Sequence, residues 1–194
     1  SDFGLSDWFV GVVHGVLHSD APGIHVVDLA HSVPPGNIAR GAFMLEAAAP
    51  DFPAGTIHLA VVDPGVGSKR HPILVKTKNY LFVGPDNGLF TLPPLRDPIL
   101  GVYELTEKRF FRSEMSSTFH GRDLFGPVAA HLSRGVKPWD FGRRLPSIKT
   151  LEEFRMRRLQ KGWKGVVLFF DKFGNAFSNL HRGTVGDPSK YKVF

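Results

Sequence analysis

The chain has 194 residues, a length that predicts one large domain or one domain plus part of a second. Its composition, 42% hydrophobic and 22% charged, is typical of a globular protein and not of a disordered one. It has no cysteine, no apolar run of about 18 residues and no signal-peptide pattern, which excludes disulfides, thiolate chemistry and a membrane span and leads us to expect a cytoplasmic location. Much of the net charge of +6 lies in residues 134–164, but this stretch lacks interleaved aromatic residues suited to base stacking and matches no nucleic-acid motif. A solvated linker or attraction of an anionic group is therefore favoured over nucleic-acid binding.

Helices and strands are predicted to alternate through the first 135 residues. A first helix follows the opening loop, with Ser6 or Asp7 as its cap, and a second begins at Asn37. A third helix is predicted over 122–134, with Gly135 as its stop. The predicted strands are 24–29, 56–62, 73–76, 80–83 and 102–105. This alternation predicts an α/β domain at 1–135 whose mostly parallel sheet is covered by helices on both faces.

The texture of the sequence changes after the third helix. Residues 136–164 are polar, basic and interrupted by prolines, which predicts a linker. Residues 165–194 open with a β-hairpin around the turn at 171–175. About thirty residues are too few to bury a core alone, so we expect the start of a β domain that is incomplete in this chain or is completed by a partner.

The segment 60–70 is the most informative one. Two valines lead into Asp63, and a turn rich in glycine and proline then delivers Arg70 seven residues later. A carboxylate at the end of a buried strand lies at the edge where open α/β sheets build ligand sites. We therefore expect Asp63 and Arg70 to mark a binding or catalytic site.

Four separated stretches support this expectation when they are taken together. They are DFGLSD at 2–7, VDPGVGS at 62–68 followed by Arg70, TFHGRD at 118–123 and DKFGN at 171–175. In this order, and with VDLAHSVPP at 27–35, FPAGTIH at 52–58 and GPDNGL at 84–89, they resemble the S-adenosylmethionine (SAM) hydrolases, also called SAM hydroxide adenosyltransferases. These enzymes are the water-using relatives of the SAM-dependent fluorinase and chlorinase, and the resemblance covers nearly the whole chain.

The resemblance implies a fold and an assembly. It predicts an amino-terminal α/β domain, a smaller carboxyl-terminal domain similar to a β-barrel, and a homotrimer with active sites between neighbouring subunits. The family also has a strand before the position of Asp2 and a segment beyond that of Phe194, neither of which is in this sequence. The expected substrate site is therefore incomplete as written.

The resemblance also implies a reaction, the hydrolysis of SAM to adenosine and L-methionine, with SAM as substrate and no cofactor. The family's catalytic set matches Asp63, Arg70 and His120. The halogenases instead have tyrosine at the position of Asp63 and serine at that of Gly121, which favours water over halide here. Arg70 stays protonated and orients the nucleophile, while Asp63 or His120 takes the proton, and the sequence does not decide between these two.

Three further residues match the family's substrate contacts: Asp2 for the ribose hydroxyls, Asp7 for the methionine ammonium and Asn175 for the purine edge. Beside them we expect Asp171 to face the methionine end and Phe173 and Phe177 to be candidates for stacking on adenine. Phe173 and Phe177 fit the core of the hairpin equally well. The remaining histidines show no metal-ligand spacing, and no metal is expected.

Three alternatives stay open beside the hydrolase. The chain could be a SAM-dependent halogenase, a non-catalytic module that binds SAM or adenosine, or a nucleic-acid-binding protein.

Overall fold

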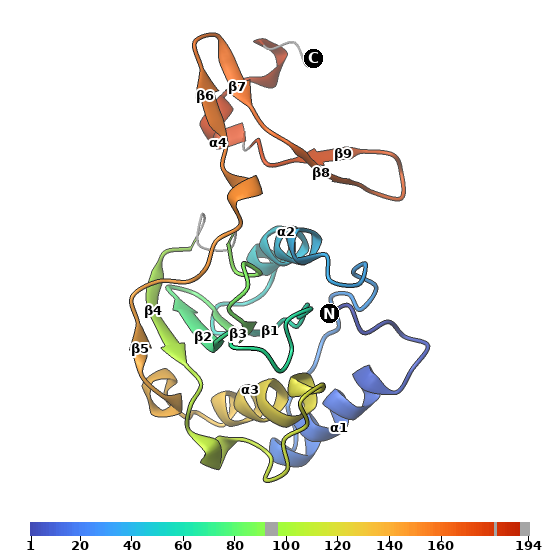
Figure 1. Ribbon diagram of the computed structural model, residues 1–194, viewed down its shortest axis with the longest axis vertical. Helices are drawn as coiled ribbons and strands as arrows, with labels where there is room; N and C mark the ends of the chain where they lie inside the picture. The colour runs from blue at the N-terminus through green and yellow to red at the C-terminus, as the bar shows by residue number, and fades with distance from the viewer. Residues whose placement is uncertain (92–96, 181, 191–194) are drawn as a thin grey trace. The chain divides into compact units, whose positions relative to one another are not determined.

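The computed structural model describes residues 1–91, 97–180 and 182–190, and the chain divides into two compact units (Figure 1). Unit 1 is Ser1–Thr150 and unit 2 is Leu151–Phe194. The stretch 136–164, for which a linker was predicted, is shared between them. Its first part belongs to unit 1, because Phe141 is fully buried in the core there.

Unit 1 contains a five-stranded sheet with the strand order β1-β3-β2-β4-β5. The strands are β1 (Ile57–Leu59), β2 (Pro72–Thr77), β3 (Leu81–Pro85), β4 (Ile99–Glu104) and β5 (Arg144–Leu145). β1 and β3 are parallel, whereas the other three neighbouring pairs are antiparallel.

The α/β class is confirmed, but the described sheet is mixed rather than mostly parallel. The reason is the connection between β2 and β3, which is only three residues long and closes with a bond from Thr77 N to the Tyr80 carbonyl at 3.0 Å. Such a short connection can only reverse the chain, because a parallel crossover needs about a dozen residues or more. The hairpin itself was predicted from the sequence.

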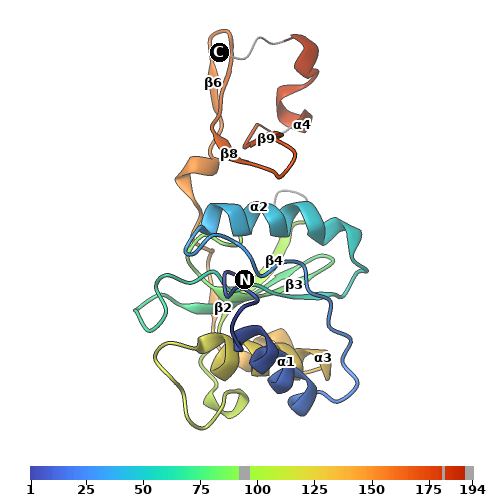
Figure 2. The ribbon, with the colours of Figure 1, turned by 90° about the vertical axis from the view of Figure 1, so that its right-hand side faces the viewer.

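Helices cover both faces of this sheet, with α2 on one side and α1 and α3 on the other (Figure 2). The helices and short helical turns of unit 1 are α1 (Phe9–Asp20), α2 (Ile38–Ala48), η1 (Ala49–Asp51), η3 (Lys108–Phe110), η4 (Gly121–Phe125), α3 (Gly126–Ser133) and η5 (Pro138–Phe141). Successive side chains of β2 point to opposite faces of the sheet and pack against the helices on each face. Ile73 and Val75 join the core that contains Leu45 of α2, while Leu74 packs with Val128 of α3.

Two of the three predicted helix-end residues are found at helix ends in the structure. The Asn37 side chain caps α2 by accepting from Arg40 N at 2.9 Å, and Gly135 ends α3 with a φ of 91°. The expected cap of the first helix was wrong. The residue before α1 is Trp8, and no side chain caps this end.

The predicted strand at 24–29 was also wrong within the described residues. This segment belongs to no sheet, although it is rich in β-favouring residues. Strand formation needs a hydrogen-bonded neighbour, and no described strand pairs with this segment. Short contacts near its end hold it instead, including Ser1 N to the Ala30 carbonyl at 2.8 Å.

Unit 2 contains two separate hairpins and no closed barrel among its described residues. Its elements are η6 (Glu152–Phe154), β6 (Arg157–Leu159), β7 (Gly162–Lys164), β8 (Val167–Phe170), β9 (Ala176–Ser178), α4 (Arg182–Val185) and η7 (Pro188–Lys190). The hairpin of β8 and β9 is the one predicted from the sequence. Nowhere in the described chain is a helix long and apolar enough to cross a membrane.

Candidate functional site

Asp63 follows the continuation of β1 at its carboxyl end. Ala60 N still donates to the Val83 carbonyl at 3.0 Å, so the chain remains beside β3 as it leaves the strand. Val62 is buried, and its carbonyl accepts a hydrogen bond from the Asn87 side chain at 2.8 Å. The turn at 84–88 therefore holds the backbone immediately before Asp63.

A tight turn returns the chain from Asp63 to Arg70. Val66 N donates to the Asp63 carbonyl at 3.1 Å, and Gly67 has a φ of 76°, which favours glycine. A Cβ on Gly67 would lie 2.6 Å from the Ser117 carbonyl oxygen, so the position also has no room for a side chain. This close approach packs the turn against the loop that leads to His120.

Asp63 and Arg70 form a buried ion pair joined by three hydrogen bonds. Arg70 Nε donates to both carboxylate oxygens at 2.9 and 3.1 Å, and Nη2 donates to Oδ2 at 2.5 Å. The two side chains are only 4% and 6% exposed. A buried charge needs such compensation, because removing an ion from water costs several kcal/mol. The guanidinium is therefore fixed in direction as well as in charge.

His120 joins this pair from a different part of the chain. It precedes the π-helical turn η4, which leads directly into α3. Arg70 Nη2 lies 2.8 Å from His120 Nδ1. Because arginine is only a donor, Nδ1 must accept, and the hydrogen of the neutral ring is then on Nε2. The structure thus brings together Asp63, Arg70 and His120, with the Arg70 cation between the Asp63 carboxylate and the His120 ring.

The electrostatics keep His120 neutral. Burial lowers its pKa below the ordinary value of 6.5, and the adjacent Arg70 cation lowers it further against the opposing effect of Asp63 and Asp123. A neutral imidazole whose Nε2–H is not used by Arg70 can orient a polar ligand atom. A buried carboxylate held by a fixed guanidinium can accept a proton from the same atom.

Asp123 is a supporting residue that the sequence analysis did not single out. Its side chain is fully buried, accepts from Arg122 Nε and Nη2 at 2.5 and 3.0 Å, and accepts from Ser116 N at 2.8 Å. Burial alone would raise its pKa, but these hydrogen bonds lower it. Asp123 therefore fixes the loop before His120. The signal was available as an aspartate directly before the apolar run at 124–130.

Phe3 closes the space beside Gly121. A Cβ on Gly121 would lie 2.9 Å from the tip of the Phe3 ring, which also contacts Phe9 and Phe119 at centroid distances of 6.2 and 5.7 Å. Any larger residue at this position would have to displace the aromatic cluster. The absence of a side chain at Gly121 is thus a packing requirement as well as a sequence feature.

Asp2 and Asp7 occupy different environments. Asp2 Oδ2 accepts from Gly36 N at 2.9 Å, and a Cβ on Gly36 would lie 3.5 Å from Pro64 in the turn after Asp63. Asp2 is thereby tied to the loops that surround the buried pair. Asp7 is exposed beside α1, where its carboxylate accepts from Ser6 Oγ at 3.5 Å.

The remaining predicted contacts lie in unit 2, at the tip of the hairpin formed by β8 and β9. Asp171 Oδ1 accepts from Phe173 N at 2.8 Å and from Asn175 N at 2.9 Å, and Oδ2 accepts from Asn175 Nδ2 at 2.8 Å. Asp171 and Asn175 thus shape their own turn, and the Asn175 bond is the main cause that lowers the pKa of Asp171. Phe173 is 77% exposed, whereas Phe177 stacks on Phe169 at 5.0 Å within the hairpin.

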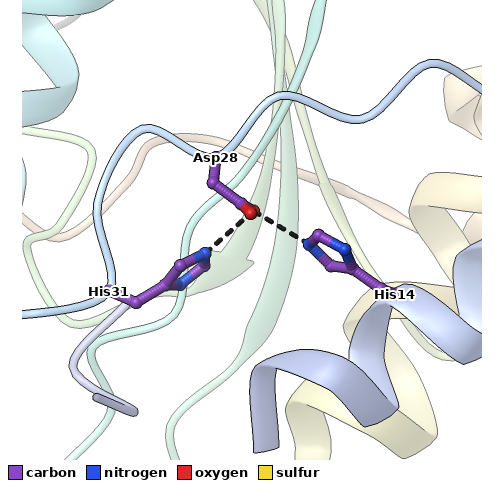
Figure 3. Close-up of side chains that lie close together, drawn as sticks. All are labelled: His14, Asp28 and His31. Atoms are coloured by element: carbon purple, nitrogen blue, oxygen red, sulfur yellow. Dashed lines mark hydrogen bonds and ion pairs between the residues drawn. The ribbon is translucent and has the colours of Figure 1, made fainter. Parts of the chain in front are cut away.

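A second feature of unit 1 is a largely apolar cavity of about 640 Å³. Residues of the opening segment, α1, the extended segment 24–31 and β1 line it, and none of Asp63, Arg70 and His120 is among them. His14, Asp28 and His31 lie together in its wall (Figure 3). Among the described residues this is the one group of three or more histidine, aspartate or glutamate side chains whose ligand atoms all lie within 4.8 Å of one another. The sequence analysis missed it because His14 is far in sequence from Asp28 and His31.

Comparisons with known proteins show which proteins this chain is similar to. Residues 1–142 match the sequence model of the SAM hydroxide adenosyltransferase N-terminal domain. The chain is 45% identical over 193 residues to the "(R)-S-adenosyl-L-methionine hydrolase" of Thermus thermophilus, covering 96% of this chain and 74% of that protein. It is 25% identical to a "Fluorinase" of Actinoplanes sp., covering 94% and 70%. A crystal structure of an uncharacterized conserved protein from Thermotoga maritima superposes with a TM-score of 0.86 at 38% identity, covering 93% of this chain and 69% of that one.

Proposed function

The chain belongs to the SAM hydroxide adenosyltransferase family, and from this premise we propose that it hydrolyses SAM to adenosine and L-methionine. One observation carries the proposal beyond the family relationship. It is the Arg70 guanidinium, which donates both to the buried Asp63 carboxylate and to His120 Nδ1. This arrangement suits the activation of a neutral nucleophile such as water.

The leaving group needs little help in this reaction. Water oxygen attacks C5′ of SAM, the C5′–S bond breaks, and its electron pair stays on sulfur, so that methionine leaves as a neutral thioether. The sulfonium charge is thereby lost, and no acid is needed on the leaving side. Catalysis then depends on aligning a weak nucleophile with C5′ and removing its proton.

Each residue of the buried set has a distinct role in this proposal. His120 directs its Nε2–H at the water oxygen, because Nδ1 is engaged by Arg70. Arg70 stays protonated and stabilises hydroxide character as the new bond forms. Asp63 is the favoured proton acceptor, since a neutral His120 with its hydrogen on Nε2 would first have to change tautomer. An ion-paired carboxylate is a weak base, so the proton moves as the attacking water becomes acidic.

The substrate contacts proposed from the family are divided between the two units. Asp2 and Asp7 would hold the ribose hydroxyls and the methionine ammonium, while Asp171, Phe173 and Asn175 would serve the methionine and adenine ends. The exposure of Phe173 supports a contact with a ligand or another subunit. We propose a homotrimer in which the carboxyl-terminal β domain of one subunit completes the α/β domain of the next, in the cytoplasm and without a cofactor.

Halide chemistry is the main alternative, and two observations disfavour it. A desolvated halide beside Asp63 would be repelled by the carboxylate, whereas water gains an acceptor there. The halogenase serine at the position of Gly121 would also collide with Phe3. A SAM-binding module without turnover is the other alternative, and it would leave SAM intact.

The test is to incubate the chain with SAM in ¹⁸O-labelled water, with and without chloride or fluoride, and to analyse the products by chromatography and mass spectrometry. The proposal predicts equal amounts of adenosine and methionine, with ¹⁸O in the 5′-hydroxyl and no dependence on halide. Halide-dependent 5′-halo-5′-deoxyadenosine would overturn it in favour of a halogenase. Binding of SAM without products would overturn it in favour of a binding module.

A further inference from the structure

Two histidines and an aspartate converge at the wall of the apolar cavity (Figure 3). Asp28 Oδ1 lies 2.8 Å from His14 Nε2 and 2.9 Å from His31 Nε2. All three ligand atoms lie within 4.8 Å of one another. The cluster shares no residue with the set of Asp63, Arg70 and His120, and the proposed reaction does not use it.

The surrounding backbone holds the three side chains in register. His14 lies in the middle of α1, whereas Asp28 and His31 lie on the extended segment that passes beside it. Two contacts from the opening residues hold this segment: Ser1 N donates to the Ala30 carbonyl at 2.8 Å, and Gly4 N donates to the His31 carbonyl at 2.7 Å. The convergence therefore rests on contacts between segments.

We propose that His14, Asp28 and His31 bind one divalent first-row transition-metal ion, such as Zn²⁺ or Co²⁺. Two imidazole nitrogens and one carboxylate oxygen are a ligand set typical of these ions. With metal–ligand distances of about 2.1 Å, adjacent octahedral positions are about 3.0 Å apart and tetrahedral positions about 3.4 Å. The observed 2.8 and 2.9 Å separations fit octahedral positions in which Asp28 Oδ1 is adjacent to each histidine nitrogen, with water in the positions that these three residues do not fill.

A second group orients one of the ligands. Ser1 Oγ lies 2.9 Å from His31 Nδ1, the ring nitrogen that faces away from Asp28. Metal-bound histidines commonly engage their second ring nitrogen in such a hydrogen bond, which fixes the tautomer and the ring plane. With Nδ1–H donating to Ser1 Oγ, His31 Nε2 keeps a lone pair for the ion.

Charge and access also favour a cation here. The aspartate supplies an anionic oxygen ligand, which suits a divalent cation. The side chains of His14, Asp28 and His31 are 31%, 45% and 18% exposed. An ion can therefore reach the ligands from solvent without opening the core.

The test measures metal binding directly, so it does not depend on SAM turnover. The full chain is stripped with a chelator and titrated with Zn²⁺ by calorimetry and with Co²⁺ by visible absorption. We expect one ion per chain, ligand-field bands from Co²⁺, and a higher melting temperature with Zn²⁺. His14→Gln, Asp28→Asn and His31→Gln should each weaken binding by about 100-fold, and Ser1→Ala by about 10-fold.

Two matched controls lie close to the cluster without belonging to it. His18 is one helical turn from His14 on α1, and His25 lies on the same extended segment as Asp28. His18→Gln and His25→Gln should bind the ion like the unaltered chain. No stoichiometric binding, or equal binding by His14→Gln and His18→Gln, would overturn the proposal. Circular dichroism identifies any variant that fails to fold. If the ligand variants do not fold, unchanged metal affinity in Ser1→Ala would overturn the proposal, and affinity about 10-fold weaker would support it.

Discussion

Arg70 Nη2 donates to His120 Nδ1 at 2.8 Å while the same guanidinium is paired with Asp63. The contact connects residues fifty positions apart and requires His120 to accept at Nδ1, so it exists only while the imidazole is neutral. Protonation of His120 would place two cations in contact. The protonation state of one histidine is therefore coupled to the geometry of the whole buried set.

The first prediction concerns the pH dependence of SAM turnover. Burial, and then the Arg70 cation, lower the pKa of His120 below 6.5, so the neutral form persists to more acidic pH than in a free histidine. We expect kcat/KM to stay constant as the pH falls to 6.5. Below pH 6.5 it should decrease, because a single group, neutral His120, becomes protonated. The measurements are a pH–rate profile and an NMR titration of His120.

A charge-removing variant supplies the control for this titration. Arg70→Gln removes the cation that disfavours protonation, so the NMR-measured pKa of His120 should rise toward 6.5. An unchanged pKa in this variant, or an acidic limb above pH 6.5 in the unaltered enzyme, would contradict the coupling.

The second prediction concerns the buried ion pair itself. Asp63→Asn removes the carboxylate, and Arg70→Lys removes the two-pronged donor. Each should lower SAM turnover by about 10²–10⁴-fold. Asp63→Ala also leaves a buried cation without its partner, which should lower the free energy of unfolding by about 3–5 kcal/mol. Steady-state kinetics and urea denaturation check these expectations.

The pair of Arg109 and Glu107 is the matched surface control. Its side chains are 67% and 48% exposed, and the two charges are 3.9 Å apart. Glu107→Ala should change the free energy of unfolding by about 0–1 kcal/mol and leave turnover unaltered. Equal effects of Asp63→Ala and Glu107→Ala would show that burial of the first pair is unimportant.

Local signals in the sequence predicted those parts of the fold that depend on neighbouring residues. The Asn37 cap and the Gly135 stop follow from side-chain chemistry within one turn of the chain, and the structure contains both. Strand direction and strand pairing were harder to predict from the sequence. The segment 24–29 has β-favouring residues but no described neighbour to pair with, and no local pattern can reveal a missing neighbour.

The candidate site shows the same division. The seven-residue spacing of Asp63 and Arg70 indicated a site, but only the family resemblance pointed to His120, since nothing local connects residue 120 with residue 70. Asp123 and the cluster of His14, Asp28 and His31 were missed because their roles depend on segments that meet only after folding.

The third prediction concerns stability in acid. His58 is buried between Phe52, Tyr80 and Phe82, and burial lowers its pKa from 6.5 to about 4. Among the described residues no hydrogen-bond partner reaches its Nε2. The unfolded chain therefore binds the proton more tightly, and stability should decrease as pH falls from 6.5 to 4, by about 3 kcal/mol. Urea denaturation against pH measures this loss.

His58→Phe is the informative variant for that prediction. It retains an aromatic ring against Phe82 but cannot titrate, so part of the acid-induced loss should disappear between pH 6.5 and 4. The same pH slope in both proteins would contradict the assignment to His58.

The fourth prediction tests the close approach that joins the two halves of the site. Gly67 and Gly55 both have left-handed backbones, with φ of 76° and 90°, but their surroundings differ. A Cβ on Gly67 would lie 2.6 Å from the Ser117 carbonyl oxygen, whereas nothing lies within 4 Å of a Cβ on Gly55.

Gly55→Ala should therefore lower the free energy of unfolding only by the conformational penalty of about 1–2 kcal/mol and leave turnover intact. Gly67→Ala should cost more and separate Arg70 from His120, which lowers SAM turnover by about 100-fold, since a misplacement of about 1 Å can have that effect. Urea denaturation and steady-state kinetics of both variants decide the matter, and equal turnover in the two would mean that this contact does not position the site.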